Sequence, residues 1–161
     1  MKPRRVIIAA GLVCGLLGLG LQVYAYMTEV PSGFQRVDFV KQISQASIVS
    51  DNANKIRVIP SLQALNGKRI FVKGRMYPQP MMGGLDDFFL ITQEKARELC
   101  PVLRMNDFIK VKMTNGLTAN YTDDLISVAG VFRIRDTDQL RSSEHAFELE
   151  AASVGPSKTF Y

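Results

Sequence analysis

The sequence predicts a mainly β protein, a small five-stranded OB-like Greek-key barrel behind one N-terminal transmembrane helix. Three observations carry this prediction. Residues 6–27 form an uncharged apolar run, five later segments alternate apolar and polar residues, and Gly74 and Gly130 interrupt two of these segments. Alternation is typical of half-buried strands, and a small residue in mid-strand lets a barrel curve. A five-stranded sandwich is the alternative.

The N-terminal segment has the length and composition of a membrane anchor. Residues 6–27 carry no charge, and a helix of that length crosses a hydrocarbon layer of about 30 Å. The basic residues within residues 1–5 would keep the N-terminus in the cytoplasm. We therefore expect a single-pass protein of the bacterial inner membrane with its C-terminal domain in the periplasm. Removal of a signal peptide after residue 25 and lipidation of Cys14 are the alternatives.

Small residues within the membrane run indicate a helix partner. Gly11 and Gly15 form a G-x-x-x-G pair, which lets two helices approach closely, and Gly18 adds a further small residue. Glycine is also frequent in membrane helices generally, so both interpretations stay open. The first one predicts that Gly11, Gly15 and Gly18 pack against other integral membrane subunits.

The charge balance and the cysteines limit the classes of function. The formal net charge is +5, and residues 1–5 hold three of these charges, which leaves the rest of the chain near +2. A nucleic-acid-binding domain is normally strongly basic, so we expect no nucleic acid as a partner. Of the two cysteines, Cys14 lies in the membrane run and Cys100 in the later domain. We therefore expect no disulfide within the chain.

The chain divides into four predicted parts. They are a basic stub and transmembrane helix in residues 1–27, a linker and amphipathic helix in 28–54, the OB-like domain in 55–154 and a tail in 155–161. The amphipathic helix is expected over Phe34–Ser50, where apolar residues recur at four- and three-residue spacing.

The predicted barrel begins with the segment Leu65–Pro80. Asn66-Gly67 opens it as a turn signal, and Ile70, Val72 and Met76 share one face. The remaining predicted strands are Asp87–Thr92, Asp107–Met113, Leu125–Arg135 and Ala146–Val154. Two short helices accompany them: a turn over 61–65 that Ser61 caps, and a charged helix over 93–99.

Basic side chains alternate with the apolar residues of the first and third strands. These are Arg69, Lys73, Arg75, Lys110 and Lys112. Merged into one face, they would suit anionic lipid head groups or an acidic partner protein. The simpler interpretation, which we favour, is the solvated outer side of a barrel.

The residues that catalysis or metal binding requires are not gathered in the sequence. The single histidine, His145, has no second histidine or nearby cysteine with which to hold zinc. The serines at 142–143 are too close to it in the chain to form a triad. The Asp pairs at 86–87 and 123–124 are typical of turns. We therefore expect no enzyme, no metal site and no cofactor, and Cys100 is a candidate thiol site.

Three motifs resemble an uncharacterised family of small bacterial exported domains. They are L-N-G-K-R-I-F-V-K-G-R-M-Y-P at 65–78, G-L-D-D-F-F-L at 84–90 and Y-T-D-D-L-I-S-V-A-G-V-F-R-I at 121–134. The resemblance implies an OB-like β domain behind a signal or anchor. Many members carry a Cys-rich or Cys-His motif between the second and third strands, where this chain keeps only Cys100. The resemblance carries no activity over to this chain.

Together these features predict a non-enzymatic accessory subunit of an inner-membrane protein complex. Its partners would be integral membrane subunits, reached through the helix and the β domain, and membrane lipids. The alternative is a periplasmic ligand- or metal-binding module that serves a membrane transporter or a cofactor-maturation system.

Overall fold

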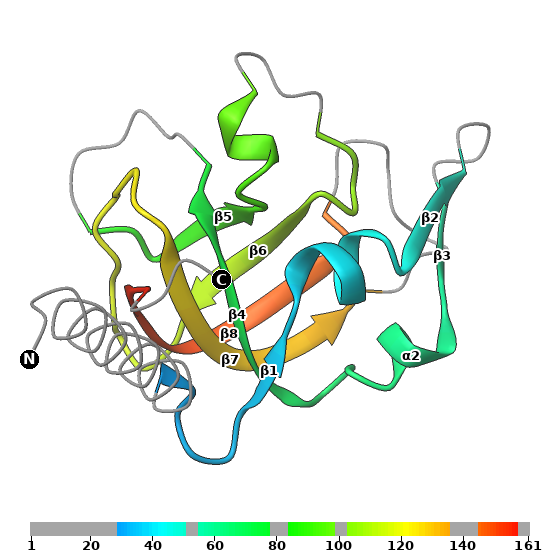
Figure 1. Cartoon of the computed structure of the whole chain (residues 1–161). Helices are drawn as coiled ribbons and strands as arrows, with labels where there is room; N and C mark the ends of the chain where they lie inside the picture. Colours follow the sequence, from blue (N-terminus) through cyan, green and yellow to red (C-terminus); the bar gives the residue numbers. More distant parts are fainter. Residues whose placement is uncertain (1–28, 51–54, 78–83, 99–102, 136–144, 158–161) are drawn as a thin grey trace, which may run out of the picture.

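A closed mixed barrel of five strands forms the centre of the fold. The structure, a computed structural model, describes residues 29–50, 55–77, 84–98, 103–135 and 145–157. The barrel strands are β4 (Arg69–Met76), β5 (Asp87–Ile91), β6 (Phe108–Met113), β7 (Ile126–Ile134) and β8 (Phe147–Pro156). They follow the order β4-β5-β6-β8-β7, and β7 pairs again with β4, which closes the barrel (Figure 1). Within this barrel β6 and β8 run parallel, and the other neighbours run antiparallel.

The predicted mainly β class and the five barrel strands are confirmed. β4 is shorter at both ends than the predicted segment Leu65–Pro80, and β8 extends two residues beyond Val154. The alternation has the predicted phase, because Ile70 and Val72 on β4 lie in one buried core cluster. A single cluster of buried apolar side chains fills the barrel, as expected when every strand turns one face inward.

Two mid-strand glycines lie where main chains approach closely. A Cβ atom on Gly130 would lie 2.4 Å from the carbonyl oxygen of Glu150, and one on Gly74 would lie 2.6 Å from that of Ile91. The register of β7 against β8 also shifts between Ala129 and Gly130, which marks a β-bulge. The two glycines that the sequence suggested for curvature are therefore required by close packing of strands.

The long helix predicted over Phe34–Ser50 is wrong. That segment contains β1 (Gln35–Val37), the π-helical turn η1 (Phe39–Ser44) and β2 (Ser47–Ser50). β5 pairs only with the end of β4, so the start of β4 has an edge on which β1 adds in parallel. This tertiary pairing outweighs the local helical spacing.

The remaining elements are short. β2 pairs with β3 (Lys55–Val58) in a separate two-stranded sheet. The helical turn α2 (Pro60–Gln63) has Ile59 at its N-cap position and no side-chain capping hydrogen bond, so the predicted capping by Ser61 is wrong. Pro60 starts the turn instead, since proline fits the first helical position. The predicted helix over 93–99 is reduced to the 3-10 turn η2 (Lys95–Arg97).

Several predictions concern residues that the structure does not describe. The predicted membrane run, with Gly11, Gly15 and Gly18, lies outside the described residues, and so does Cys100. Within the described part of the chain, none of the helices has the length and apolar character needed to span a membrane.

Candidate functional site

A buried carboxylate joins segments that are far apart in the sequence. The side chain of Glu29 is 3 % exposed, and its Oε2 lies 2.6 Å from Lys73 Nζ on β4 and 3.4 Å from a guanidinium nitrogen of Arg36. Its Oε1 accepts hydrogen bonds from the hydroxyls of Ser127 on β7, at 3.0 Å, and of Ser157, at 2.8 Å. We call these five residues the Glu29 junction.

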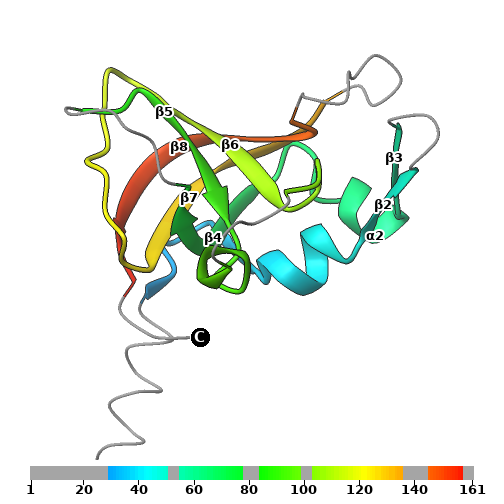
Figure 2. The ribbon, with the colours of Figure 1, turned by 90° about the horizontal axis from the view of Figure 1, so that it is seen from above.

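The junction holds the two ends of the described chain together. Figure 2 shows the blue segment that starts at residue 29 beside the red end of β8. Burial lowers the pKa of Lys73 below its ordinary value, and the hydrogen bond and charge of Glu29 offset this only in part. Removing the carboxylate would therefore leave a cation in a poorly hydrated position, which is costly. The residues around Glu29 thus fix how the chain enters and leaves the barrel.

Sequence reasoning missed this junction. It assigned Glu29 to a linker, because its partners lie between 7 and 128 positions away in the chain. Pairing of β4 with β7 places Ser127 directly opposite Lys73. The one signal in the sequence is the polar pair of Ser127 and Lys73, which could be recognised only once the register of β4 against β7 was known.

The structure divides the five predicted basic residues between two strands. On β4, Arg69 lies over the ring of Phe34, with 4.2 Å from its guanidinium carbon to the ring centroid. Lys73 belongs to the Glu29 junction, and Arg75 donates a hydrogen bond to the main-chain oxygen of Asp123. These three side chains therefore bind groups of the same domain.

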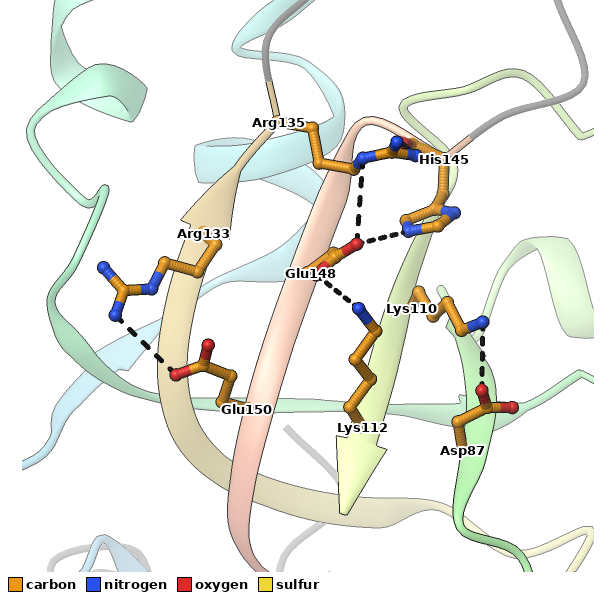
Figure 3. Close-up of polar contacts among 8 residues, drawn as sticks. All are labelled: Asp87, Lys110, Lys112, Arg133, Arg135, His145, Glu148 and Glu150. Carbon is orange, nitrogen blue, oxygen red and sulfur yellow. Dashed lines mark hydrogen bonds and ion pairs between the residues drawn. The ribbon is translucent and has the colours of Figure 1, made fainter. Parts of the chain in front are cut away.

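The β6 lysines lie in a second group, on the outer face of the barrel. Lys110 Nζ is 2.9 Å from Asp87 on β5, and Lys112 Nζ is 2.9 Å from Glu148 on β8. The group extends across β7 and β8 and forms a charged ladder (Figure 3). The charged ladder consists of Asp87, Lys110, Lys112, Arg133, Arg135, His145, Glu148 and Glu150.

Glu148 is the centre of the charged ladder. Besides Lys112, its carboxylate has His145 Nε2 at 2.8 Å and Arg135 Nε at 3.8 Å. Burial alone would raise the pKa of Glu148, but the hydrogen bonds with Lys112 and His145 and their charges lower it below its ordinary value. A carboxylate held in this way stays ionised and serves to organise cations.

The charged ladder produces little net positive potential that could attract an anionic ligand. Its lysines and arginines alternate with carboxylates on neighbouring strands, as opposite charges in cross-strand pairs do. Phe89 also covers part of this face, since its ring contacts those of Phe108 and His145 edge to face. This geometry favours the solvated outer side of a barrel over a lipid-binding face.

Of the residues considered for catalysis and metal binding, the structure describes His145 but not Cys100. His145 is engaged by Glu148, and no cysteine lies among the described residues. No group of three or more histidine, cysteine, aspartate or glutamate side chains in the described ranges could hold a metal ion. The polar groups of the Glu29 junction and the charged ladder form ion pairs and hydrogen bonds that link strands.

Comparison with known proteins supports the fold. No protein-family model matches the chain, and no curated protein matches it. The chain is similar in structure to a DUF3299 family protein from Pseudomonas aeruginosa PAO1, with 18 % identity and a TM-score of 0.55 over 80 % of this chain and 99 % of that chain. It also matches a putative aspartyl-tRNA synthetase from Leishmania major Friedlin, with 9 % identity and a TM-score of 0.42 over 81 % and 22 %. The first likeness shows a shared five-strand barrel, and the second carries no argument.

Proposed function

We propose that this protein is a non-enzymatic accessory subunit of a bacterial inner-membrane complex. In this proposal residues 6–27 anchor the chain in the membrane, and an OB-type barrel lies in the periplasm and braces neighbouring subunits. The strand order, with its parallel contact of β6 and β8 and its closure by β7 on β4, supports the OB-type assignment.

The Glu29 junction is the observation that carries the proposal. Glu29 follows the predicted membrane run by two residues, and its carboxylate is bound to β4, to β7 and to the residue after β8. In this proposal only residue 28 separates the predicted anchor from Glu29, so the link between anchor and barrel would be short. A short link that limits the motion of the barrel suits a subunit that braces its neighbours.

The outer face gives a second line of support. Its lysine and arginine side chains form ion pairs with carboxylates of the same domain. An anionic membrane surface would therefore be attracted only weakly to this face. A protein neighbour, which binds through shape and main-chain groups, fits this surface better than lipid does.

The proposal is tested by purifying the tagged full chain from membranes in a mild detergent. We expect it to elute with other integral membrane proteins, at a size well above its own 17.9 kDa and micelle. Glu29→Ala should remain in the membrane fraction but lose most of this association, because its barrel is no longer fixed. Glu150→Gln, a change in a surface carboxylate, is the matched control.

Two results would contradict the proposal. One is elution of the unmodified chain alone, or bound only to a small ligand or metal ion, as the alternative binding module requires. The other is undiminished association of the Glu29→Ala variant.

A further inference from the structure

The second half of β8 has a partner strand on one side only. From Glu148 to Ala151 the strand lies between β6 and β7. From Ser153 to Pro156 it pairs with β7, and no other strand of the described chain pairs with its opposite edge. β6 ends at Met113, so the barrel wall opens here. An open strand edge is a template for a further strand.

The main-chain groups of Val154 point toward this open edge. The N–H of Ser157 donates to the carbonyl of Leu125 at 2.9 Å, which marks a hydrogen-bonded pair at the end of the β7–β8 ladder. Such pairs alternate with non-hydrogen-bonded ones in antiparallel sheets. Val154 lies three residues before Ser157 and pairs with Val128. Because the two pair types alternate, Val154 and Val128 form a non-hydrogen-bonded pair, in which the N–H and C=O point away from the partner strand. Among the described residues, neither the N–H nor the C=O of Val154 has a main-chain partner outside the ladder.

A cleft of about 600 Å³ runs alongside the open edge. The apolar side chains of Met76, Met113 and Val154 line it on the barrel side, and segment 117–122 lines it opposite. Leu117 in that segment is 45 % exposed, which makes it an unusually exposed large apolar side chain at the cleft. The cleft thus offers apolar side chains beside main-chain groups of Val154 that no described residue pairs.

The wall opposite β8 is held in place before anything binds. Ala119 and Leu85 exchange two main-chain hydrogen bonds, with N···O distances of 2.8 and 3.0 Å. A fixed wall lowers the ordering cost of binding.

The rim of the cleft is acidic. Asp124 lines it, and Asp123 beside it accepts a hydrogen bond from the hydroxyl of Tyr121 at 2.6 Å. That hydrogen bond, with burial second, raises the pKa of Tyr121, so the phenol stays neutral. Arg75 contributes one positive charge, through its contact with the main-chain oxygen of Asp123. Two carboxylates against one guanidinium favour a basic ligand.

We propose that this cleft binds an extended, basic segment of a partner protein, which adds a strand to β8 at Val154. The segment inserts an aliphatic side chain beside Leu117 and Met113 and places a lysine or arginine near Asp124. Main-chain hydrogen bonds supply affinity and the apolar contact supplies specificity, as in other cases of strand addition. The inference rests on the proposed accessory role and names the surface that the role uses.

A polypeptide explains the cleft better than a small apolar molecule does. A lipid chain would fill the apolar volume but leave the N–H and C=O of Val154 without partners, which costs free energy once water is excluded. An extended peptide satisfies both groups and the apolar surface together.

The test selects peptides on the full chain held in phospholipid nanodiscs, from a phage-displayed library of random dodecapeptides. We expect enriched sequences that alternate aliphatic residues and contain lysine or arginine. The enriched peptide is then synthesised, and its dissociation constant is measured by fluorescence anisotropy. Leu117→Asp should weaken binding at least tenfold, since it places a charge in the apolar contact. N-methylation of the peptide residue that faces Val154 should weaken it by a similar factor, because it removes a main-chain donor.

Ile59→Asp provides the matched control. Ile59 is 39 % exposed, comparable to Leu117, and it directly precedes α2, which lies on the far side of the barrel (Figure 1). This variant should bind the peptide as the unmodified chain does.

Three results would overturn the inference. The first is that Leu117→Asp binds the peptide as tightly as the unmodified chain does. The second is that the N-methylated peptide binds as tightly as the unmodified peptide. The third is that no peptide is enriched, whereas a fatty acid binds to the unmodified chain and not to Leu117→Asp. None of these results affects the co-purification on which the accessory role stands, so the two proposals fail separately.

Discussion

The two halves of β8 have different neighbours although they belong to one strand. In the first half Leu149 and Ala151 are fully buried, with β6 on one side and β7 on the other. Among the described strands, the second half pairs with β7 only, and it borders the cleft. The comparison teaches that the barrel is closed along one part of this strand and incomplete along the other.

The outward side chains follow the same division. Glu148 and Glu150 in the first half are bound by cations from β6 and β7. After Ala151, the residues Ala152 and Ser153 are small, uncharged and exposed. The first half therefore presents a surface whose charges are already satisfied, and the second presents main chain and apolar side chains.

The largest effect is expected where the two halves meet. In Gly130→Ala the new Cβ would lie 2.4 Å from the carbonyl oxygen of Glu150, which the ladder holds in place. We expect a loss of about 3 kcal/mol in the free energy of unfolding, since overpacking a strand contact displaces main chain. Urea denaturation followed by far-UV circular dichroism measures it.

Gly155→Ala is the control for that substitution. A Cβ atom on Gly155 meets nothing within 4 Å, so this change in the open half should cost about 0.5 kcal/mol or less. Equal losses for the two variants would show that the halves of β8 are packed alike.

The second prediction concerns the Glu29 junction, which holds the residue after the open half. Glu29→Ala leaves the partly buried ammonium of Lys73 without its carboxylate and should lower the free energy of unfolding by about 2 kcal/mol. Adding Lys73→Met should restore part of this loss, because the unpaired charge is then gone. A double-mutant cycle by urea denaturation measures the coupling, and additive losses would contradict the account of the junction.

The third prediction uses pH to test the closed half. The folded-state pKa of Glu148 lies below its ordinary value of 4.5, so the stabilisation is present above that value and is lost as the pH falls through the folded-state pKa. Glu148→Gln should therefore remove about 1 kcal/mol at neutral pH and flatten the decline in stability on acidification. Denaturation midpoints measured between neutral and acidic pH check this.

Glu150→Gln is the matched control on the same strand. The carboxylate of Glu150 is 45 % exposed and lies 3.7 Å from Arg133, whereas that of Glu148 is 17 % exposed. An exposed pair contributes little, so the decline on acidification should keep its slope. A flattening as large as that of Glu148→Gln would contradict the central position of Glu148.

The smallest effect is expected at the acidic rim of the open half. Replacing Asp123 and Asp124 together by asparagine should weaken binding of the basic peptide about threefold at low salt, mainly through the association rate. The difference should disappear at high ionic strength, where exposed charges are screened. Stopped-flow kinetics at two salt concentrations measures it, and a salt-independent loss would point to a structural defect.

The sequence predicted those features that depend on residues close together in the chain. Alternation of apolar and polar residues predicted the five barrel strands and their inward faces, because a strand with one buried face must alternate. The helical spacing over Phe34–Ser50 misled, since β1 gains its hydrogen bonds from β4, far along the chain. The acidic and basic residues were visible, but their pairing depends on strand register.

The open edge could not be predicted from the sequence. The segment Ala146–Val154 is predicted as one strand, and nothing in its composition indicates that its pairing with β6 ends at Ala151. The Glu29 junction was missed for the same reason, because it gathers side chains from segments that only the closed barrel brings together.

Hydrogen exchange along β8 tests the central claim most directly. Mass spectrometry can follow the amides of residues 147–151 and 153–157 in the purified chain and in the membrane complex that the proposed function predicts. The account predicts that the Leu149 amide is protected in both samples, whereas the Val154 amide exchanges rapidly in the isolated chain and becomes protected in the complex. A Val154 amide that is already as protected as that of Leu149 in the isolated chain, or that stays unprotected in the complex, would contradict it.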